Sequence, residues 1–182
     1  MDDIQTANKL LAQSEIFLPD HQVQNIVSRL AQELNKDMQF EFPVVIPVMT
    51  GGLVFCGQLL PLLDFPLQLD YMHVTRYRGE TKGSEIEWKL KPQLELNNRN
   101  ILIVDDILDE GKTASAIMKW LKESGANKIT LCVLFNKKIG KPKPIMANYV
   151  GLDIEDKYVF GFGMDIKNFW RNLSSIRAYK GE

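Results

Sequence analysis

Three short runs of almost uninterrupted apolar residues constrain the fold of this chain most. They are PVVIPVM at 43–49, NILIVD at 100–105 and KITLCVLFN at 128–136. Such runs lack the alternation of a half-exposed strand and are typical of strands buried on both faces, as in a parallel sheet. The sequence therefore predicts a sheet core that is covered on both sides.

Helical patterns stand between these runs. At 20–37, apolar residues recur every three or four positions behind Asp20, which can cap the helix. A second helix is expected at 53–63 and a third at 112–124, the latter ended by Gly125. Strands that alternate with helices predict an α/β fold with a mainly parallel sheet flanked by helices. Ligands of such sheets bind at the carboxyl ends of the strands.

The remaining segments are expected to be shorter strands and loops. Strands are predicted at 65–74, at 85–90, and near 148–151 and 157–162, from their apolar alternation. The segment 75–84 is polar, holds two glycines and carries mixed charge, so we expect a loop there.

Composition excludes several classes of protein. The 182 residues are enough for one domain over 1–182, and the net charge of −1 gives no general attraction for nucleic acid or anionic membranes. No apolar run reaches the ~20 residues that a membrane span needs. The polar, acidic N-terminus does not look like a secretory signal, and Cys56 and Cys132 sit among apolar residues as buried thiols would. We therefore expect a cytoplasmic protein.

The most unusual segment is VDDILDEGKT at 104–113, which crowds three Asp and one Glu into 105–111. It lies where a strand becomes a helix, so free backbone N–H groups and the helix dipole provide positive potential. Gly111 allows a close approach and Thr113 adds a hydroxyl donor. These features predict a phosphate-binding turn. It is not a Walker A loop, because Asp106 stands where that loop requires glycine.

The acids suit a sugar phosphate. Asp105 and Asp106 lie at the end of the expected strand, where adjacent side chains diverge, so we do not expect both to bind one metal directly. They could hold the two hydroxyls of a ribose, or a Mg²⁺ carried by those hydroxyls. Asp109, inside the turn, could act as a base or as a charge stabiliser. The alternative is an acidic helix cap that binds no ligand.

The segment ILIVDDILDEGKT resembles the phosphoribosyl pyrophosphate (PRPP) motif of type I phosphoribosyltransferases. The segments VMTGG, LDYMHVTRYRGET, LFNKK and DKYVFGFGMDIKNFWRNL resemble, in order and spacing, those of hypoxanthine-guanine phosphoribosyltransferases. This resemblance runs from about residue 40 to the C-terminus. It implies the type I phosphoribosyltransferase fold, with a small hood built from the C-terminal and N-terminal segments. The base-binding part of the hood would span about 137–182, and a mobile lid about 75–84.

The resemblance also implies an activity in purine salvage. A 6-oxopurine, hypoxanthine or guanine, would attack C1′ of PRPP through N9 in a Mg²⁺-dependent reaction, giving IMP or GMP and pyrophosphate. The transition state would resemble a ribosyl oxocarbenium ion. Relatives form homodimers or homotetramers, and no nucleic acid or membrane partner is implied.

Site residues follow from the matched positions. Asp109 would be the catalytic base near N7 of the purine, and the metal ligands would be Asp105, Asp106 and Asp165. The residues implied for PRPP or pyrophosphate are Asp105, Asp106, Glu110, Gly111, Lys112, Thr113, Thr50, Gly51 and Arg171. In the family the pyrophosphate loop holds a non-proline cis peptide, which would fall at Met49–Thr50.

Three further residues would bind the purine. Lys137 follows the buried strand expected at 128–135, so its ammonium emerges at a carboxyl end and could donate to O6. A lysine cannot accept a hydrogen bond from the 6-amino group of adenine, which would exclude that base. Tyr158 would stack on the ring, and the Val159 backbone would read its edge.

Some positions depart from the family pattern. Glu110 stands where many relatives have Thr, so we expect its carboxylate to point away from the phosphate. Thr50 replaces a common basic residue, and Arg76 replaces a common Ser in the lid. These departures bear on pyrophosphate affinity and on the lid.

Structural roles compete with the functional ones. Asp165 and Arg171 could merely pair with each other. The aromatic residues near the C-terminus could be core or subunit interface: Phe160, Phe162, Phe169 and Trp170. A xanthine-preferring enzyme remains an alternative, as does a non-catalytic, PRPP-sensing regulator that binds nucleic acid, although the near-neutral charge and the presence of Asp109 disfavour the regulator.

Overall fold

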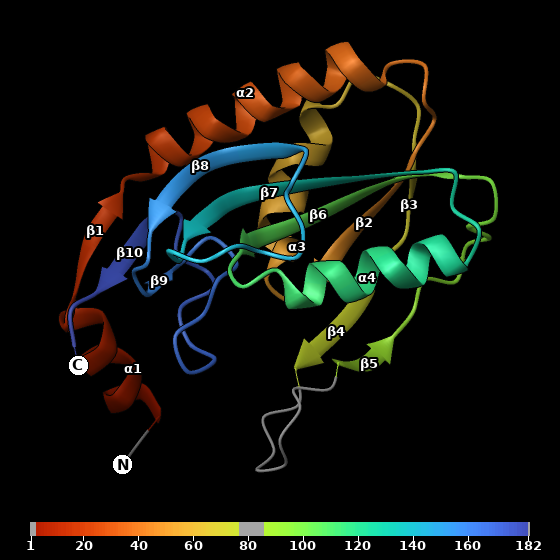
Figure 1. Ribbon diagram of the computed structural model, residues 1–182. Coiled ribbons are helices and arrows are strands. Elements are labelled where there is room, and N and C mark those ends of the chain that lie inside the picture. Colours follow the sequence, from red (N-terminus) through yellow and green to blue (C-terminus); the bar gives the residue numbers. More distant parts are fainter. Residues whose placement is uncertain (1–2, 77–85, 182) are drawn as a thin grey trace.

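The computed structural model describes residues 3–76 and 86–181. Its centre is one sheet with the strand order β5-β4-β2-β6-β7-β8 (Figure 1). The four strands β2, β6, β7 and β8 run parallel to their neighbours and have these bounds: Val44–Met49, Asn100–Leu108, Lys128–Lys138 and Tyr149–Glu155. The predicted α/β fold with a mainly parallel sheet is therefore confirmed.

The edge of the sheet beyond β2 is less regular. β3 (Gln68–Leu69) and β4 (Met72–Arg76) pair in parallel with the first and last parts of β2, and β5 (Ile86–Leu90) adds an antiparallel edge. The single strand expected at 65–74 is thus broken at Asp70, whose carboxylate accepts hydrogen bonds from three backbone N–H groups nearby. The expected lid at 75–84 lies outside the described residues from position 77 onward, while β4 continues to Arg76.

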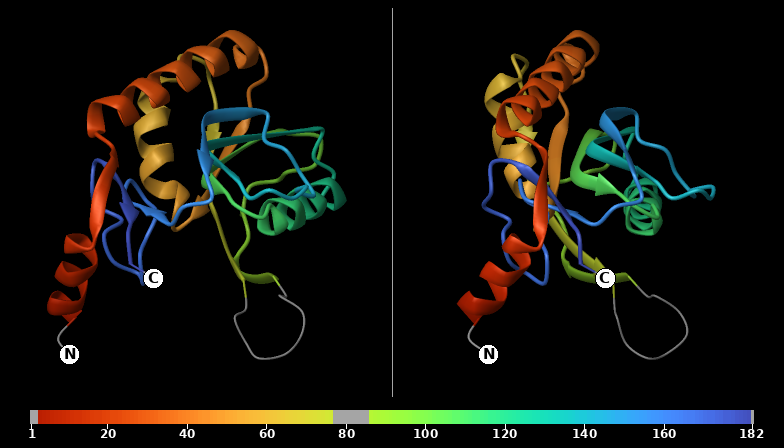
Figure 2. Two further views of the ribbon diagram at one scale, coloured as in Figure 1. Left: turned by 60° about the vertical axis from the view of Figure 1, so that its left-hand side comes forward. Right: turned by 90° about the vertical axis from the view of Figure 1, so that its left-hand side faces the viewer.

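Helices cover both faces of the sheet (Figure 2). On one face lie α2 (Asp20–Met38) and α3 (Gly52–Leu59), followed by a 3₁₀ turn at Leu60–Leu62, and on the other face lies α4 (Lys112–Glu123). Along β6, Leu102 packs toward α2 and α3 and Ile103 packs toward α4, both almost fully buried. This double burial is why the strands read as continuous apolar runs.

Two helix boundaries differ from the sequence prediction. Pro19 is the N-cap of α2, so Asp20 is the first helical residue and not the cap; its carboxylate accepts a hydrogen bond from the His21 N–H. The helix expected at 53–63 ends at Leu59, because the chain tightens into the 3₁₀ turn that contains Pro61. Gly125 follows α4 with a φ of 81°, the left-handed value expected of a helix-ending glycine.

A second, three-stranded sheet joins the two ends of the chain. β1 (Ser14–Leu18) and β9 (Val159–Phe160) both pair antiparallel with β10 (Ile176–Tyr179). The first helix, α1 (Asp3–Ala12), packs Leu10 against buried residues of the C-terminal segment. We call the second sheet and the connected segment 158–179 the hood, which the sequence resemblance implied.

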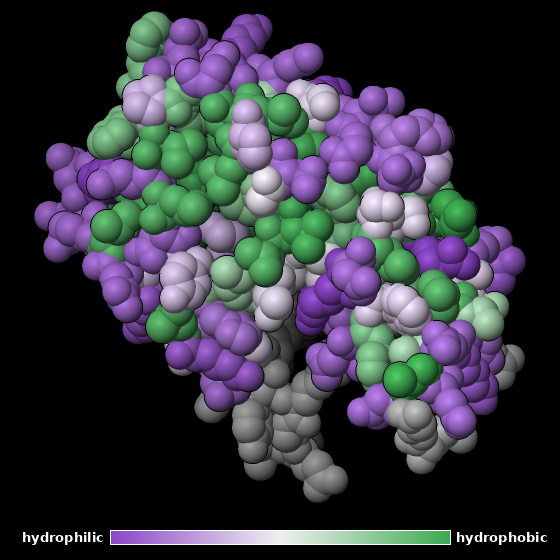
Figure 3. Space-filling model, turned by 180° about the vertical axis from the view of Figure 1, so that it is seen from behind, coloured by the Kyte–Doolittle hydropathy of each residue, from purple (hydrophilic) through white to green (hydrophobic). Residues whose placement is uncertain are grey.

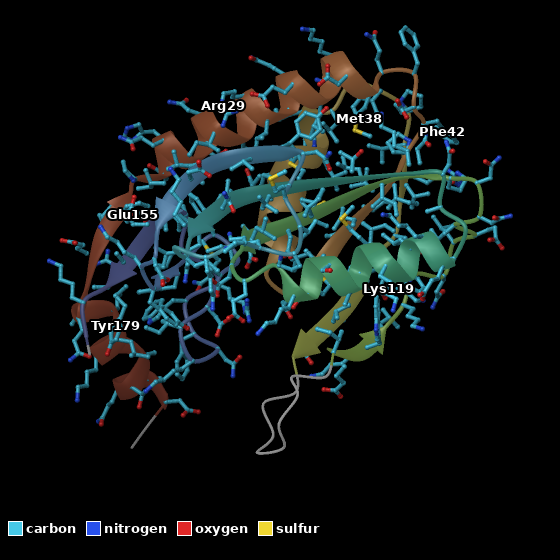
Figure 4. All side chains as sticks on the ribbon, in the orientation of Figure 1. Arg29, Met38, Phe42, Lys119, Glu155 and Tyr179 are labelled. Atoms are coloured by element: carbon cyan, nitrogen blue, oxygen red, sulfur yellow. The ribbon has the colours of Figure 1, made fainter. Side chains whose placement is uncertain are left out.

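Side-chain bonds tie these layers together. The indole N–H of Trp170 donates to the carbonyl of Ala7 at 2.7 Å, which links α1 to the C-terminal segment. Arg29 lies on α2 above β8 (Figure 4), and its guanidinium donates to the carbonyls of Val150 and Gly151. The N-terminal residues, to which the sequence assigned no chemistry, therefore complete the hood and cover the sheet.

The C-terminal aromatics are core residues. Phe160 and Phe162 are buried, and Phe169 and Trp170 pack partly buried against Phe160 and its neighbours. Exposed apolar side chains gather instead around a cavity of about 260 Å³ beside α3. We call this the α3 patch; its exposed members are Leu53, Leu69 and Tyr71. Figure 3 shows apolar residues on this rear face of the molecule.

Both cysteines are free and buried, as expected. Burial raises the pKa of the Cys56 thiol to about 12, so it is protonated at neutral pH. Within the described ranges, every helix is too short or too polar to cross a membrane.

Candidate active site

The predicted site residues meet at the carboxyl ends of β2, β6 and β7, below the hood. Two cavities lie there and share the walls Asp106, Ile107 and Asp109. The first, about 250 Å³, is lined among others by Gly51, Asp105, Gly111, Thr113 and Arg171. The second, about 210 Å³, is lined also by Lys137, Tyr158, Val159, Met164 and Asp165.

The acid pair lies within β6 and not at its end. The strand continues to Leu108, because pairing with β7 persists beyond Asp105. Asp105 accepts a hydrogen bond from the N–H of Asp106 at 3.0 Å, and Asp106 accepts one from the N–H of Ile107 at 2.7 Å. Each carboxylate thus bends toward the following N–H, and the two groups stay close enough to share a hydrogen bond. The expectation that they diverge is wrong.

Among the described residues, burial outweighs the positive charge around the acid pair. Burial raises the pKa of Asp105 well above its ordinary value, and the charge of Asp106 and the shared hydrogen bond raise it further. Burial also raises the pKa of Asp106, although hydrogen bonds from Asp105 and the Ile107 N–H and the charge of Arg171 oppose this. A bound cation would stabilise both ionised carboxylates.

The chemistry of the acid pair fits Mg²⁺. This ion is commonly held by one or two carboxylates, with water and substrate oxygens completing its shell. Over residues 3–76 and 86–181, no three His, Cys, Asp or Glu side chains gather into a complete metal site. Asp105 and Asp106 could therefore hold Mg²⁺ together with oxygens from a substrate.

The loop after β2 contacts the acid pair directly. The peptide bond Met49–Thr50 is cis, as expected from the family resemblance. A Cβ built on Gly51 would lie only 2.0 Å from Oδ2 of Asp106, and one built on Gly163 of the hood would lie 2.1 Å from the Gly51 carbonyl. Glycine is required at both positions because the loop, the acid pair and the hood are in contact.

The turn that the sequence predicts to bind phosphate has the expected local structure. Gly111 is the N-cap of α4 with a φ of 76°, and Thr113 faces the first cavity. The carboxylate of Glu110 pairs with the ammonium groups of Lys112 at 3.2 Å and Lys141 at 3.3 Å. Glu110 is thus neutralised by lysines. Glu110, Lys112 and Thr50 lie outside the described walls of both cavities.

The second cavity places a cation beside a carboxylate. Lys137 lies within β7, which continues to Lys138, and not after it as predicted. Its side chain is only 13 % exposed, and its Nζ lies 3.7 Å from Oδ1 of Asp109 and 3.5 Å from Oδ1 of Asp156. The structure therefore brings the predicted purine-binding cation and the predicted base together.

An aromatic ring and a backbone edge form the hood side of this cavity. Tyr158 is 52 % exposed, and its hydroxyl donates to the Asp165 carbonyl at 3.2 Å. Its ring packs edge-on against Tyr179, which Figure 4 labels in the hood. Val159 is buried in β9 and lines the same cavity.

Asp165 and Arg171 form the ion pair that their spacing allowed. Nη2 of Arg171 lies 2.7 Å from Oδ1 of Asp165, and Nη1 donates to the Gly163 carbonyl at 2.7 Å. Oδ2 of Asp165 accepts the N–H of Asn168 at 2.7 Å. Both carboxylate oxygens are therefore engaged within the hood.

Comparisons with known proteins agree with this geometry. Residues 13–167 match the phosphoribosyl transferase domain family. The chain is 31% identical to the hypoxanthine-guanine phosphoribosyltransferase of Staphylococcus aureus over 169 residues, 92% of this chain and 94% of that protein. It is 32% identical to the Bacillus subtilis enzyme of the same name over 168 residues, 91% of this chain and 93% of that one. The chain belongs to the hypoxanthine-guanine phosphoribosyltransferase family.

Solved structures share the fold over nearly the whole chain. The crystal structure of a hypoxanthine phosphoribosyltransferase from Staphylococcus aureus superposes with a TM-score of 0.87 at 30% identity, covering 99% of this chain and 96% of that one. A hypoxanthine-guanine-xanthine phosphoribosyltransferase gives a TM-score of 0.83 at 29% identity, covering 92% and 97%. The type I phosphoribosyltransferase fold and the assignment as a purine phosphoribosyltransferase are thereby established.

Several residues of this phosphoribosyltransferase site were missed from sequence. Asp156 pairs with Lys137, Gly163 accepts from Arg171, and Lys143 donates to the carbonyl of Leu108. The sequence did mark Gly163, because two glycines in the FGFG segment at 160–163 indicate a tight turn. Asp156 and Lys143 lie in polar loops, where nothing local marks a charged residue as part of a site.

We predict that Gly51→Ala lowers the turnover of this purine phosphoribosyltransferase by about a hundredfold, because a Cβ there displaces Asp106 or the loop. Steady-state kinetics would measure the loss. Gly57→Ala in α3 is the control: among described atoms beyond its own helix, none would lie within 4 Å of the new Cβ. It should keep full activity and gain about 0.5–1 kcal/mol of stability. Equal activities of the two variants would contradict the steric argument.

We also predict that Asp105→Asn stabilises the fold while abolishing activity. The pKa of Asp105 in the folded chain lies above its unfolded value of 3.8, so stability is lost as pH rises above 3.8 toward the folded pKa. The variant should melt at a higher temperature than the unsubstituted chain at about pH 7, and this advantage should shrink toward about pH 4. Thermal denaturation across this range, with exposed Asp64→Asn as control, measures both effects. A variant that melts lower at neutral pH would refute the electrostatic cost.

Proposed function

We propose that this chain transfers the 5-phosphoribosyl group of PRPP to N9 of hypoxanthine or guanine, in a Mg²⁺-dependent reaction that yields IMP or GMP and pyrophosphate. The observation that carries this proposal is the pair of Lys137 and Asp109, 3.7 Å apart in a cavity bordered by Tyr158. A 6-oxopurine presents O6 and N7 side by side on one edge of a flat ring. A cation, a carboxylate and an aromatic face match that edge.

Recognition of the base is assigned to the hood and the end of β7, within the proposed base-binding part at about 137–182. Lys137 donates to O6, Tyr158 stacks on the ring and the Val159 backbone reads the opposite edge. The 6-amino group of adenine is a hydrogen-bond donor. Binding adenine would therefore place two donors, this amino group and the Lys137 ammonium, against each other in a buried site. The desolvated position of Lys137, 13 % exposed, makes that mismatch costly.

The chemical step uses Asp109. As N9 forms a bond to C1′ of the ribose, the bond from C1′ to the pyrophosphate oxygen breaks and its electron pair leaves with pyrophosphate. A purine that enters with hydrogen on N7 must lose that proton, and the carboxylate of Asp109 accepts it. The ammonium of Lys137 lies 3.7 Å from this carboxylate, beside the proposed path of the proton.

The first cavity is assigned to PRPP. The backbone N–H groups of 110–113 and the Thr113 hydroxyl bind the 5′-phosphate at the start of α4. Asp105 and Asp106 hold the ribose hydroxyls and Mg²⁺, which would neutralise charge on the departing pyrophosphate. Gly51 and Thr50 offer backbone N–H groups to pyrophosphate, and Arg171 turns from Asp165 toward it. Asp165, released from Arg171, is then available to a second Mg²⁺.

We also propose that the chain works as a homodimer or homotetramer. The exposed side chains of the α3 patch, among them Leu53, Leu69 and Tyr71, are apolar and would be buried by a second copy. The C-terminal aromatics do not serve this purpose, because they are part of the core.

The proposed function is tested by a nucleotide-formation assay. The purified protein, PRPP and Mg²⁺ are mixed with hypoxanthine, guanine, xanthine or adenine, and the monophosphate product is followed with and without a chelator. We expect product from hypoxanthine or guanine, none from adenine, and loss of product on chelation. Asp109→Ala should lower turnover while PRPP still binds.

Other outcomes would change the assignment. Product mainly from xanthine would make this a xanthine-preferring enzyme. No product from any base, with PRPP still bound, would point to a regulator that senses PRPP. Loss of PRPP binding in Asp109→Ala would contradict its role as the base.

We predict that Lys137→Ala relaxes the choice of base. The preference for hypoxanthine over adenine, as a ratio of kcat/KM, should fall by about tenfold to a hundredfold, the worth of one hydrogen bond to a charged donor. Lys138→Ala is the matched control, because the next lysine of the same strand is 58% exposed and pairs with Asp153 outside the cavity. An unchanged ratio in Lys137→Ala would remove Lys137 from base recognition.

A further inference from the structure

Lys143 connects two strands of the sheet from a loop that carries none of the assigned site residues. The loop joins β7 to β8, and Lys143 reaches back from it toward the sheet. Its Nζ donates to the carbonyl of Leu108, the last residue of β6, at 2.6 Å and to Oδ1 of Asn136 in β7 at 2.7 Å. One ammonium group thus bonds the carboxyl ends of two neighbouring parallel strands.

These partners belong to one rung of the sheet. Leu108 pairs in register with Asn136, and Asn136 pairs with Asp153 of β8. The side-chain amide of Asn136 donates to Oδ1 of Asp153 at 2.8 Å. Lys143 therefore completes a chain of hydrogen bonds that crosses three strands where they approach the site.

The residues that follow this rung carry the proposed chemistry. Asp109 comes directly after Leu108, and Lys137 comes directly after Asn136. The loop also contacts the other side of the phosphate-binding turn: a Cβ built on Gly111 would lie 3.4 Å from Pro144 and Ile145 and 3.6 Å from the Lys143 Cβ. Lys143 and its neighbours thus contact the turn both before Asp109 and after it.

We propose that Lys143 is a positioning residue, whose ammonium group holds the turn at 108–111 and thereby orients Asp109 and the phosphate-binding backbone. Its effect on catalysis rests on the function proposed above. Lys143 contacts the backbone carbonyl next to Asp109 and lies outside the walls described for both site cavities.

The environment of Lys143 supports this role. The side chain is partly buried, and burial lowers its pKa, while the charges of Asp109 and Asp153 oppose that shift and that of Lys137 adds to it. An ammonium group taken out of water is stable only where acceptors replace its hydration. The Leu108 carbonyl and the Asn136 amide oxygen are those acceptors, so removing the charge leaves both without this donor.

The first test measures the turn itself and needs no activity. Hydrogen–deuterium exchange is compared for peptides covering 105–115 in the unsubstituted chain, Lys143→Met and Lys138→Met. Methionine keeps the length of the side chain and removes its charge. Lys138→Met removes a charge that faces the same Asp153 but does not contact Leu108. We expect about tenfold faster exchange in Lys143→Met alone. Equal exchange in all three proteins would overturn the proposal.

The second test measures the consequence for catalysis. In Lys143→Met, kcat should fall about tenfold and the KM for PRPP should rise, while the KM for the purine stays within about twofold, because Lys137 stays paired with Ile154 of β8 and Tyr158 lies outside the turn. Lys143→Arg, which keeps a cationic donor, should recover part of kcat. A general loss of folded protein would instead leave kcat per folded molecule unchanged, and that result would overturn the positioning role.

The two proposals fail in different ways. If the unsubstituted chain forms no nucleotide from any purine, the proposed function fails, and the exchange experiment alone still decides whether Lys143 holds the turn. If nucleotide forms but Lys143→Met matches Lys138→Met in exchange and kinetics, the proposed function stands and the role of Lys143 is refuted.

Discussion

The site depends on one constraint, the burial of the central parallel strands on both faces. Because α2 and α3 cover one face and α4 the other, the middle of β2, β6 and β7 carries no charged side chain and is almost entirely apolar. Charged side chains therefore lie near the strand ends, with Lys128 at the start of β7 and Asp105 and Lys137 toward the carboxyl edge of the sheet. That edge gathers Gly51, Asp105, Asp109 and Lys137 from three strands within two neighbouring cavities.

The charges at this edge follow a pattern. Most acids have a cation in contact: Lys137 lies beside Asp109, two lysines pair with Glu110, and Arg171 pairs with Asp165. Asp105 and Asp106 differ, since burial raises the pKa of both and the charge of Arg171 opposes this at Asp106. The free-energy cost of ionising buried carboxylates thus falls on Asp105 and Asp106, where a metal and ribose hydroxyls are proposed to bind. Functional sites commonly lower the stability of the folded protein in this way, in exchange for the ability to bind a ligand.

Local pattern was enough to predict the sheet but not its ends. The runs at 43–49, 100–105 and 128–136 are strands as predicted, because burial on two faces leaves a strong apolar signal. β2 ends at Met49 as predicted, but the ends predicted for β6 and β7 fell too early, since the two strands keep pairing past Asp105 as far as Leu108 and Asn136. The end of a strand depends on how far its backbone pairs with the neighbouring strand. The apolar pattern of one segment does not report on that pairing.

The hood and the charged contacts were less visible for a similar reason. β1 pairs with β10, so Ser14 lies opposite Tyr179, and neither short strand has a strong pattern of its own. Family resemblance supplied the existence of a hood, while the contribution of α1 required the structure. Lys143 reaches back to Leu108, and Gly51 contacts Asp106 from a separate loop. Contacts between segments so far apart in sequence are set by the topology of the sheet.

The division between sheet and hood separates two kinds of recognition. The turn and acid pair that suit a phosphorylated sugar are built into β6 and the start of α4, where the core fixes their backbone. Tyr158, Val159 and Asp165 instead stand on the hood, which packs on the α2 and α3 side of the core through residues such as Met164. Substitutions in the hood would therefore change the proposed contacts to a base without disturbing the β6 strand. Lys137 is the exception, because it belongs to the sheet yet lines the second cavity, and its position beside Asp109 places the proposed base contact next to the proposed catalytic base.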